Sequence, residues 1–513
     1  MKKLLLFAVL VLAFSATAYS QDVKLDFRAS GFIDFRTEWY RWNWTTNLAG
    51  RGFIIQAVDA DNKPPPKGGA SAWNKTSAYA EERMRLKFDA VMGKELSGTI
   101  FFEADSSYFG DYRGQTSLEG PMRNSMGWWN GDQAALEIKN AYFDVAVPYV
   151  PVPMTMRFGL QPFGIRSNMF MYADGTGVTA SAKMDPVQIT AAWAKLLEGK
   201  QANGDDSDLY ALQLSAKVDT FTIGGYGYYF DMRTYPLNNG YTSPNGVPAY
   251  GSTANSIASK MYWLGLYADG KMGPVNLNFD FVYDNGWVKK KIADQKVKYA
   301  GWASRLKIDY PWEAFNFGVV GFYGSGADAN KTDQLGLPGK PVANLGAAPA
   351  QSSRVGSYVV PINAETGAFN EGEVLTASYI NDGFTGINYS GSSFNMTRGS
   401  QGGIWIAKVY GAYKVTPEFK MTMNALYYGD TTKNGNTFGN AREADGLTLK
   451  NSSNIGFEVD LINEWQIYKN LVFRFGGGIL WAGSALSMWN PVTASNEKPN
   501  TPWIFVTRLT YSF

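Results

Sequence analysis

The sequence contains neither cysteine nor histidine among its 513 residues. Without these side chains the protein has no disulfide framework, no thiolate or imidazole metal site and no Ser-His or Cys-His catalytic pair. The acidic stretch Asp205-Asp206-Ser207-Asp208 lacks the twelve-residue calcium loop with its closing Glu, and we interpret it as a solvated turn. We therefore predict no enzyme, no cofactor and no metal site.

The sequence also lacks an excess of charge of either sign, with 47 Lys and Arg against 45 Asp and Glu. Two lysines, the apolar run Leu4–Phe14 and the small-x-small site Ala18-Tyr19-Ser20 predict a signal peptide over residues 1–20. Its removal leaves 45 basic and 45 acidic residues in one exported domain, residues 21–513. No basic domain is then available to hold a nucleic acid.

A long apolar helix is missing as well. Residues 475–496 are the best candidate, but three consecutive glycines and Pro491 interrupt them, and the mean hydropathy of the chain is −0.23. Apolar and polar residues instead alternate at period two, which is typical of strands with one apolar face. From Val23 to Trp39 the odd positions are mostly apolar and the even positions largely charged. Similar runs cover residues 81–90, 275–284, 302–310, 457–467 and 503–513.

Short and long connections alternate between these runs. Eight short turns are predicted at residues 93–95, 148–153, 185–186, 219–220, 270–274, 311–314, 416–418 and 468–470. Long polar stretches separate them at residues 43–78, 107–133, 232–260, 324–402 and 430–453. We predict an all-β fold, a closed antiparallel transmembrane barrel of about 18 strands with short periplasmic turns and long extracellular loops. Residues 324–402, too long for an ordinary loop, are a lid, a plug or a surface loop.

The charged face of the strands predicts a water-filled interior, because a barrel of this size is too wide for side chains to fill. Charged side chains in a pore select ions, although many of them also pair with neighbours and support the wall. The predicted pore-lining residues are Arg28, Asp34, Arg36, Arg83, Arg85, Lys87, Arg157, Asp280, Arg305, Lys307, Glu458, Asp460, Arg474 and Arg508.

A constriction is predicted in residues 164–177, the third long connection in chain order. There Arg166, Tyr172 and Asp174 are expected to reach the lumen. The alternative is a loop packed on the rim of the barrel. On the predicted outside, Lys289-Lys290-Lys291 is either a site for lipopolysaccharide phosphates or a solvated run of charge.

The signal peptide, the rhythm of strands and turns and the terminal Tyr511-Ser512-Phe513 resemble Gram-negative outer-membrane porins. That resemblance implies that the barrel-assembly machinery reads Phe513, and it makes a homotrimer an expectation. Three local segments, Glu82–Phe88, Arg157–Gly164 and Gly456–Leu461, look like segments of deltaproteobacterial-type porins and of alginate-export-type barrels, which have 18 strands.

Three functions fit this interpretation. The first is a porin in the outer membrane for passive diffusion of small hydrophilic solutes and ions, with lipid and lipopolysaccharide around it. The second is a barrel specific for an exopolysaccharide or another solute. The third is a sheath that holds an electron-transfer partner.

Overall fold

The computed structural model describes residues 24–41, 77–106, 136–198, 204–233, 257–290, 296–328, 354–361, 371–380, 402–439, 441–490, 494–498 and 501–513. The predicted signal peptide, residues 1–20, lies outside these ranges, as does Lys291. Within them, no helix has the length and apolar character needed to cross a bilayer.

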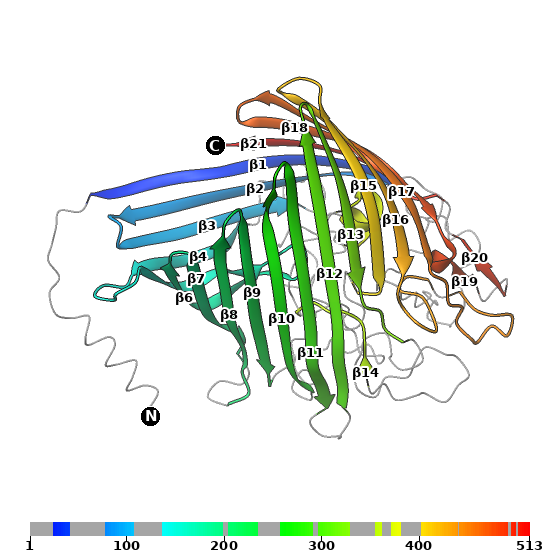
Figure 1. The fold of residues 1–513 in the computed structure, drawn as a ribbon, viewed down its shortest axis with the longest axis horizontal. Helices are drawn as coiled ribbons and strands as arrows, with labels where there is room; N and C mark the ends of the chain where they lie inside the picture. Colours follow the sequence, from blue (N-terminus) through cyan, green and yellow to red (C-terminus); the bar gives the residue numbers. More distant parts are fainter. Residues whose placement is uncertain are drawn as a thin grey trace, which may run out of the picture.

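Eighteen antiparallel strands form one closed wall (Figure 1). The first strand pairs with the second over its whole length and with the last strand from Phe32↔Ser512 to Arg41↔Trp503, so the sheet closes on itself. The predicted closed 18-stranded antiparallel barrel is thereby confirmed. The wall strands are β1 (Leu25–Arg41), β2 (Ser77–Met92), β3 (Leu96–Ser106), β4 (Glu137–Ala146), β5 (Met154–Ile165), β6 (Met171–Met184), β7 (Val187–Leu197), β8 (Ser207–Val218), β9 (Phe221–Met232), β10 (Ile257–Met272), β11 (Val275–Lys290), β12 (Lys296–Trp312), β13 (Phe315–Gly324), β15 (Ile404–Lys414), β16 (Phe419–Asp430), β17 (Asn454–Tyr468), β18 (Leu471–Ala482) and β21 (Trp503–Ser512).

All eight predicted short turns join neighbouring strands on one rim. Two-residue turns include those between β8 and β9, at Asp219–Thr220, and between β10 and β11, at Gly273–Pro274. Asp219 and Gly273 have φ values of 54° and 60°, the left-handed conformation that two-residue hairpin turns require. Small additional elements are not among the 18 wall strands: β14 (Arg354–Val355), η3 (Glu373–Ile380), η4 (Ser484–Leu486), β19 (Met488–Asn490) and β20 (Ser495–Glu497).

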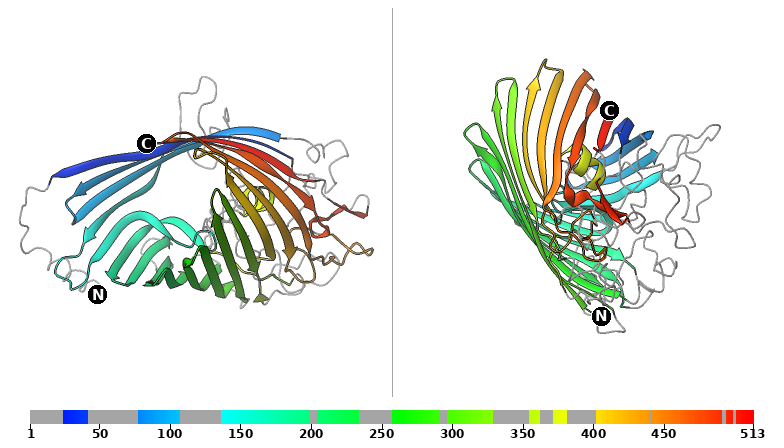
Figure 2. Two further views of the ribbon diagram at one scale, coloured as in Figure 1. Left: turned by 45° about the horizontal axis from the view of Figure 1, so that its top comes forward. Right: turned by 90° about the vertical axis from the view of Figure 1, so that its right-hand side faces the viewer.

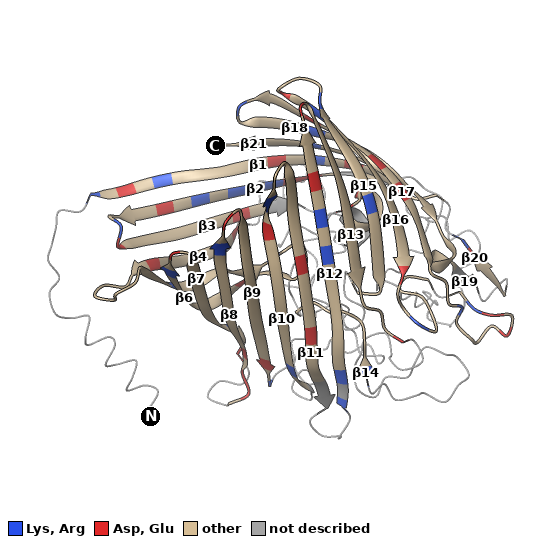
Figure 3. Cartoon of the chain, viewed as in Figure 1, with Lys and Arg blue, Asp and Glu red and all other residues tan. Residues whose placement is uncertain are grey.

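The two faces of the wall differ in chemistry, as β17 illustrates. Phe457 and Leu461 are 42% and 46% exposed on the outer face, while Glu458 and Asp460 between them are fully buried on the inner face. Charged positions are spread along the strands and are not confined to their ends (Figure 3). Because side chains alternate between faces along a strand, the outer face of the wall is apolar, and the charged side chains of strands such as β17 lie on its inner face.

Aromatic side chains cluster on the outer face next to the short turns. Phe315 stacks on Tyr413 with ring centroids 4.6 Å apart, and Trp312 and Phe317 lie at 6.0 and 5.7 Å from Phe315. Aromatic girdles of this kind flank the apolar band of membrane barrels.

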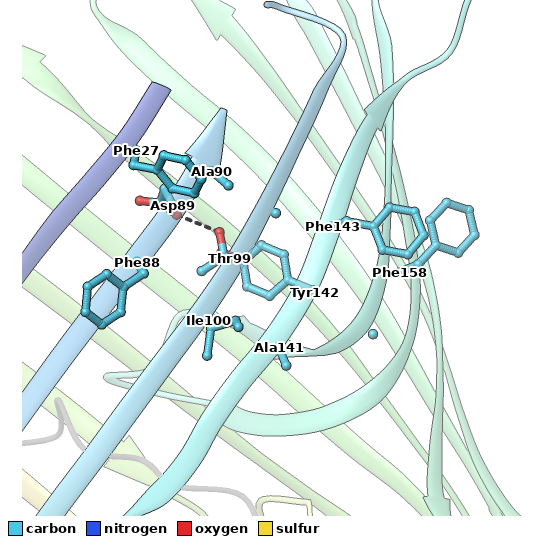
Figure 4. Close-up of a pocket in the computed structure, with 12 residues that line it drawn as sticks. Phe27, Phe88, Asp89, Ala90, Thr99, Ile100, Ala141, Tyr142, Phe143 and Phe158 are labelled. Carbon is cyan, nitrogen blue, oxygen red and sulfur yellow. Dashed lines mark hydrogen bonds between the residues drawn. The ribbon is translucent and has the colours of Figure 1, made fainter. Parts of the chain in front are cut away.

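A shallow groove interrupts the outer face of β1 to β5 (Figure 4). Ala90 and Gly98, which stand opposite one another on β2 and β3, and Ala141 of β4 leave room for it, because their side chains are small. The groove has a volume of about 530 Å³, and apolar side chains wall it: Phe27, Phe88, Ile100, Phe143 and Phe158. It belongs to the apolar exterior and not to the ionic interior.

The main apolar core lies inside the barrel. Phe170, from the connection between β5 and β6, packs with its ring centroid 5.1 Å from both Tyr226 and Tyr228 of β9 and 6.0 Å from Trp263 of β10. Tyr358, from the connection between β13 and β15, donates a hydrogen bond to the carbonyl of Met169 (2.6 Å). Two connections from distant parts of the wall therefore meet in the interior. Figure 2 shows the barrel from two further directions.

Candidate functional site

A charged cluster lies on the inner face of the barrel at the seam where β1 pairs with β21. Asp34 is 2% exposed and accepts hydrogen bonds from Arg508 Nε (2.8 Å), Thr510 Oγ1 (3.0 Å) and Arg36 Nη2 (3.3 Å). Arg36 also pairs with Glu81 of β2 at 3.1 Å. Arg508 keeps 38% of its side chain exposed. Asp34 thus links β1 to β21, and Arg36 links β1 to β2 through Glu81, while Arg508 remains partly open to the interior.

A row of arginines crosses this seam. Arg36, Arg508 and Arg474 stand directly opposite one another on β1, β21 and β18. Like charges in opposing positions destabilise a sheet, so each of them needs carboxylates nearby. The carboxylates are Asp34 and Glu81 for Arg36, Asp34 for Arg508, and Glu373 for Arg474.

The predicted basic residues on β2 and β5 have partners on neighbouring positions. Arg85 pairs with Glu103 of β3, and Lys87 pairs with Asp89 at 2.9 Å. Arg157 forms a two-pronged contact with Asp144 (2.7 and 2.9 Å). Bidentate guanidinium–carboxylate contacts of this kind fix the geometry of both side chains. Arg83 stands opposite Asp34 in the β1–β2 pair, and Lys307 of β12 lies 3.5 Å from Asp309.

Arg166 connects separate parts of the wall across the interior. It leaves the end of β5, pairs with Asp269 of β10 at 2.6 Å and also pairs with Asp280 of β11. Burial alone would lower the pKa of this guanidinium, but the hydrogen bonds with Asp280 and Asp269 outweigh it and raise the pKa above its ordinary value. Since β5 and β10 are not neighbours, this bridge runs through the lumen.

The predicted loop over residues 164–177 is wrong in its extent. Strand β5 continues to Ile165 and β6 begins at Met171, so only residues 166–170 connect them. Tyr172 and Asp174 are strand residues. Asp174 accepts hydrogen bonds from Lys139 and Asn140 of β4, both at 2.7 Å, and the hydroxyl of Tyr172 lies 3.4 Å from it.

Residues 357–360 contact β10 and β11 of the wall. Asp284 is fully buried and accepts hydrogen bonds from the backbone N–H groups of Val359 and Gly301, both at 3.2 Å. Trp263 Nε1 donates to the carbonyl of Val359 (2.8 Å). Burial raises the pKa of Tyr358 well above its ordinary value, so this side chain stays a neutral hydrogen-bond donor.

Residues 371–376 lie in the interior against β12, β15, β17 and β18. Arg305 contacts Glu371 at 2.6 Å, and Arg474 contacts Glu373 at 2.5 Å. Glu458 accepts hydrogen bonds from the backbone of this segment, and Asp460 accepts another. Four predicted wall residues therefore contact a segment that the sequence did not connect with them.

Arg28 and Phe513 occupy the end of the seam. Strand β21 stops pairing with β1 at Phe32. Beyond it, the N–H of Phe513 donates to the carbonyl of Gly31 (3.0 Å), and the N–H of Gly31 donates to the carbonyl of Phe513 (2.9 Å). Arg28 lies beyond that point, where β1 pairs only with β2, and contacts Asp26 with 64% of its side chain exposed. Arg28 therefore lies outside the closed part of the wall, contrary to the prediction.

Several contact residues of the interior were missed. Glu103, Asp144 and Asp269 follow the same period-two pattern as their partners and could have been found from it. Glu371 and Glu373 could not, because they lie in a stretch without periodicity.

Neither family models nor curated proteins match this chain. Solved structures with a similar fold include OccK5 (OpdH) of Pseudomonas aeruginosa, with 9% identity, a TM-score of 0.45 and coverage of 94% of this chain and 98% of that chain. OpdK of the same organism, solved with vanillate, has 8% identity, a TM-score of 0.44 and coverage of 94% and 98%. A BenF-like porin from Pseudomonas fluorescens Pf-5 gives the same four values. These scores are too low to transfer a function, and no comparison bears on the resemblance to deltaproteobacterial or alginate-export barrels.

Proposed function

We propose that the protein is an outer-membrane porin, a channel through which small hydrophilic solutes and ions diffuse. The observation that carries this proposal is the chemistry of the closed wall, apolar outside and ionic inside. A closed barrel leaves no unpaired backbone edge in hydrocarbon, and an ionic interior holds water.

The described segments inside the barrel support a narrowed channel. Residues 166–170, 354–361 and 371–376 occupy parts of the interior; Arg166 pairs with Asp269 across it, and Tyr172 and Asp174 lie at the start of β6, next to residues 166–170. We propose that they form the constriction, and that the long connection over residues 324–402 acts as a plug. A sheath for a protein partner would need this interior space, so a solute channel is the better candidate.

A barrel specific for one solute remains the second candidate. Arg508 favours it, because its half-exposed guanidinium stands in a row of arginines beside a narrowed interior. A specific channel would saturate with its solute, whereas a diffusion porin would conduct in proportion to concentration.

Planar-bilayer recording of the purified full-length protein tests the channel. We expect stepwise ohmic currents, with larger steps in a variant whose residues 329–401 are replaced by a short Gly-Ser linker. Folding is checked by the heat-dependent shift of electrophoretic mobility. Folded protein that gives no current in either form would contradict the proposal.

A further inference from the structure

Glu371 and Glu373 are bound by cations of the wall. Arg305 reaches Glu371 Oε1 through Nη2 (2.6 Å) and Nε (2.7 Å), and Lys408 Nζ lies 3.4 Å from Oε2 of the same carboxylate. Arg474 Nη2 lies 2.5 Å from Glu373 Oε1. Both carboxylates are only 6% exposed. Charged hydrogen bonds in such a site are strong because little water screens them.

The backbone of the segment is bound by wall carboxylates. The N–H groups of Val374 and Leu375 donate to the two oxygens of Glu458 (2.7 and 2.9 Å), and that of Glu373 donates to Asp460 (3.3 Å). Within the segment, Thr376 Oγ1 accepts from the N–H groups of Glu371 (3.0 Å) and Gly372 (2.7 Å). The turn is therefore shaped by its own contacts and seated by contacts to the wall.

Access to the wall cations is uneven. The side chains of Arg305 and Lys408 are 9% and 10% exposed, whereas Arg474 keeps 29% of its side chain exposed. A dissolved anion can therefore reach Arg474 while the segment is seated. Arg305 and Lys408 become accessible only after Glu371 leaves.

We propose that residues 371–376 are a latch on the lumen, and that a small dicarboxylate opens it by replacing Glu373 on Arg474 and Glu371 on Arg305 and Lys408. This inference rests on the proposed channel. A ligand shifts an equilibrium only when it binds one state better, and here the dicarboxylate binds the unlatched state, in which both cation sites are vacant. A monocarboxylate can fill only one of the two sites.

The first test removes the latch charges. In single-channel recording, Glu371→Gln/Glu373→Gln shortens the low-conductance dwell times about tenfold or more, because the charged contacts of both carboxylates to Arg305, Lys408 and Arg474 are lost. The matched control is Glu443→Gln/Glu464→Gln, which removes two carboxylates that pair with Lys450 (3.8 Å) and Lys420 (2.6 Å) away from the segment. The control keeps native dwell times. Equal dwell times in the latch variant and the native protein overturn the latch.

Two single variants distinguish loss of the latch contact from a general effect of charge in the lumen. Arg474→Gln removes a positive charge, while Glu373→Gln removes a negative one, so their effects on ion selectivity are opposite. Both nevertheless break the same contact and shorten the low-conductance dwell times. Dwell times that change in opposite directions overturn the latch, and each variant is first shown to fold by its heat-dependent mobility.

The third test adds the ligand. Succinate at constant ionic strength shortens the low-conductance dwell times of the native channel, acetate has a clearly weaker effect, and the double Gln variant responds to neither. A native channel that conducts but treats succinate and acetate alike overturns the latch and leaves the channel standing. Folded protein that conducts in no variant overturns the channel, and the latch with it.

Discussion

The buried carboxylate at the seam offers the sharpest test of the wall. Asp34 and Arg36 on β1 are two residues apart, with side chains 2% and 10% exposed. Asp26 and Arg28 on the same strand have the same chemistry and spacing, with side chains 53% and 64% exposed. Removing one partner of a buried ion pair costs about 3–5 kcal/mol, whereas an exposed pair contributes about 0–1 kcal/mol.

For Asp34→Asn we expect the free energy of unfolding to fall by about 2–3 kcal/mol, less than for complete loss of a buried partner. The reason is that Asn keeps one acceptor oxygen and Arg36 keeps Glu81 at 3.1 Å. Asp26→Asn, the control, is expected to change the free energy of unfolding by less than about 1 kcal/mol. Urea unfolding in lipid vesicles, followed by tryptophan fluorescence, measures both. At a slope of about 2–3 kcal/mol per molar urea, the midpoint of Asp34→Asn falls by about 1 M. Equal shifts in the two variants would refute the argument from burial.

Three further predictions concern the lipid face, the constriction and assembly. Val409 lies at the middle of β15 and is 57% exposed, so Val409→Arg lowers the free energy of unfolding by about 2–4 kcal/mol. Val415→Arg, beside a short turn, lowers it by about 0–1 kcal/mol. Equal losses in vesicle unfolding would contradict the assigned lipid face. Arg166→Gln leaves Asp269 and Asp280 without this cation, so the reversal potential in a salt gradient moves toward cation selectivity. Arg28→Gln, outside the closed part of the wall, does not move it, and an unmoved potential in the Arg166 variant removes Arg166 from the pore. Phe513→Ala lowers the amount of heat-modifiable barrel in outer membranes, whereas Phe505→Ala, on β21, does not. Equal amounts of the two variants would exclude an assembly role for Phe513.

The wall could be predicted from the sequence because its signals are local. A strand between lipid and water must alternate, as Phe457, Glu458, Val459 and Asp460 do, and a tight turn needs residues such as Gly273 that adopt positive φ. Neither signal depends on distant residues. The number of turns then determined the number of strands, and closure followed from the requirement that no edge remain unpaired.

The predicted loop over residues 164–177 was too long because Gly164, Gly175 and Gly177 lie in strands. A Cβ on Gly177 would lie 2.0 Å from the carbonyl oxygen of Trp193, and one on Gly164 would lie 2.8 Å from that of Met171. These glycines allow neighbouring strands to approach closely, which is the other role of glycine in a sheet. Composition does not distinguish a loop glycine from one at a close approach between strands, because strand pairing determines which backbone lies next to the glycine.

The alternation fixes which face a charge lies on, but not what it contacts there. Arg85 and Arg305 have the same pattern in the sequence, yet Arg85 pairs within the wall and Arg305 binds Glu371, 66 residues further along the chain. The choice between supporting the wall and seating an inserted segment therefore depends on where residues 371–376 lie. Because nothing in that stretch repeats at period two or 3.6, its position follows from the contacts it makes: cations for its two carboxylates, carboxylates for its backbone N–H groups, and the apolar core for Val374 and Leu375.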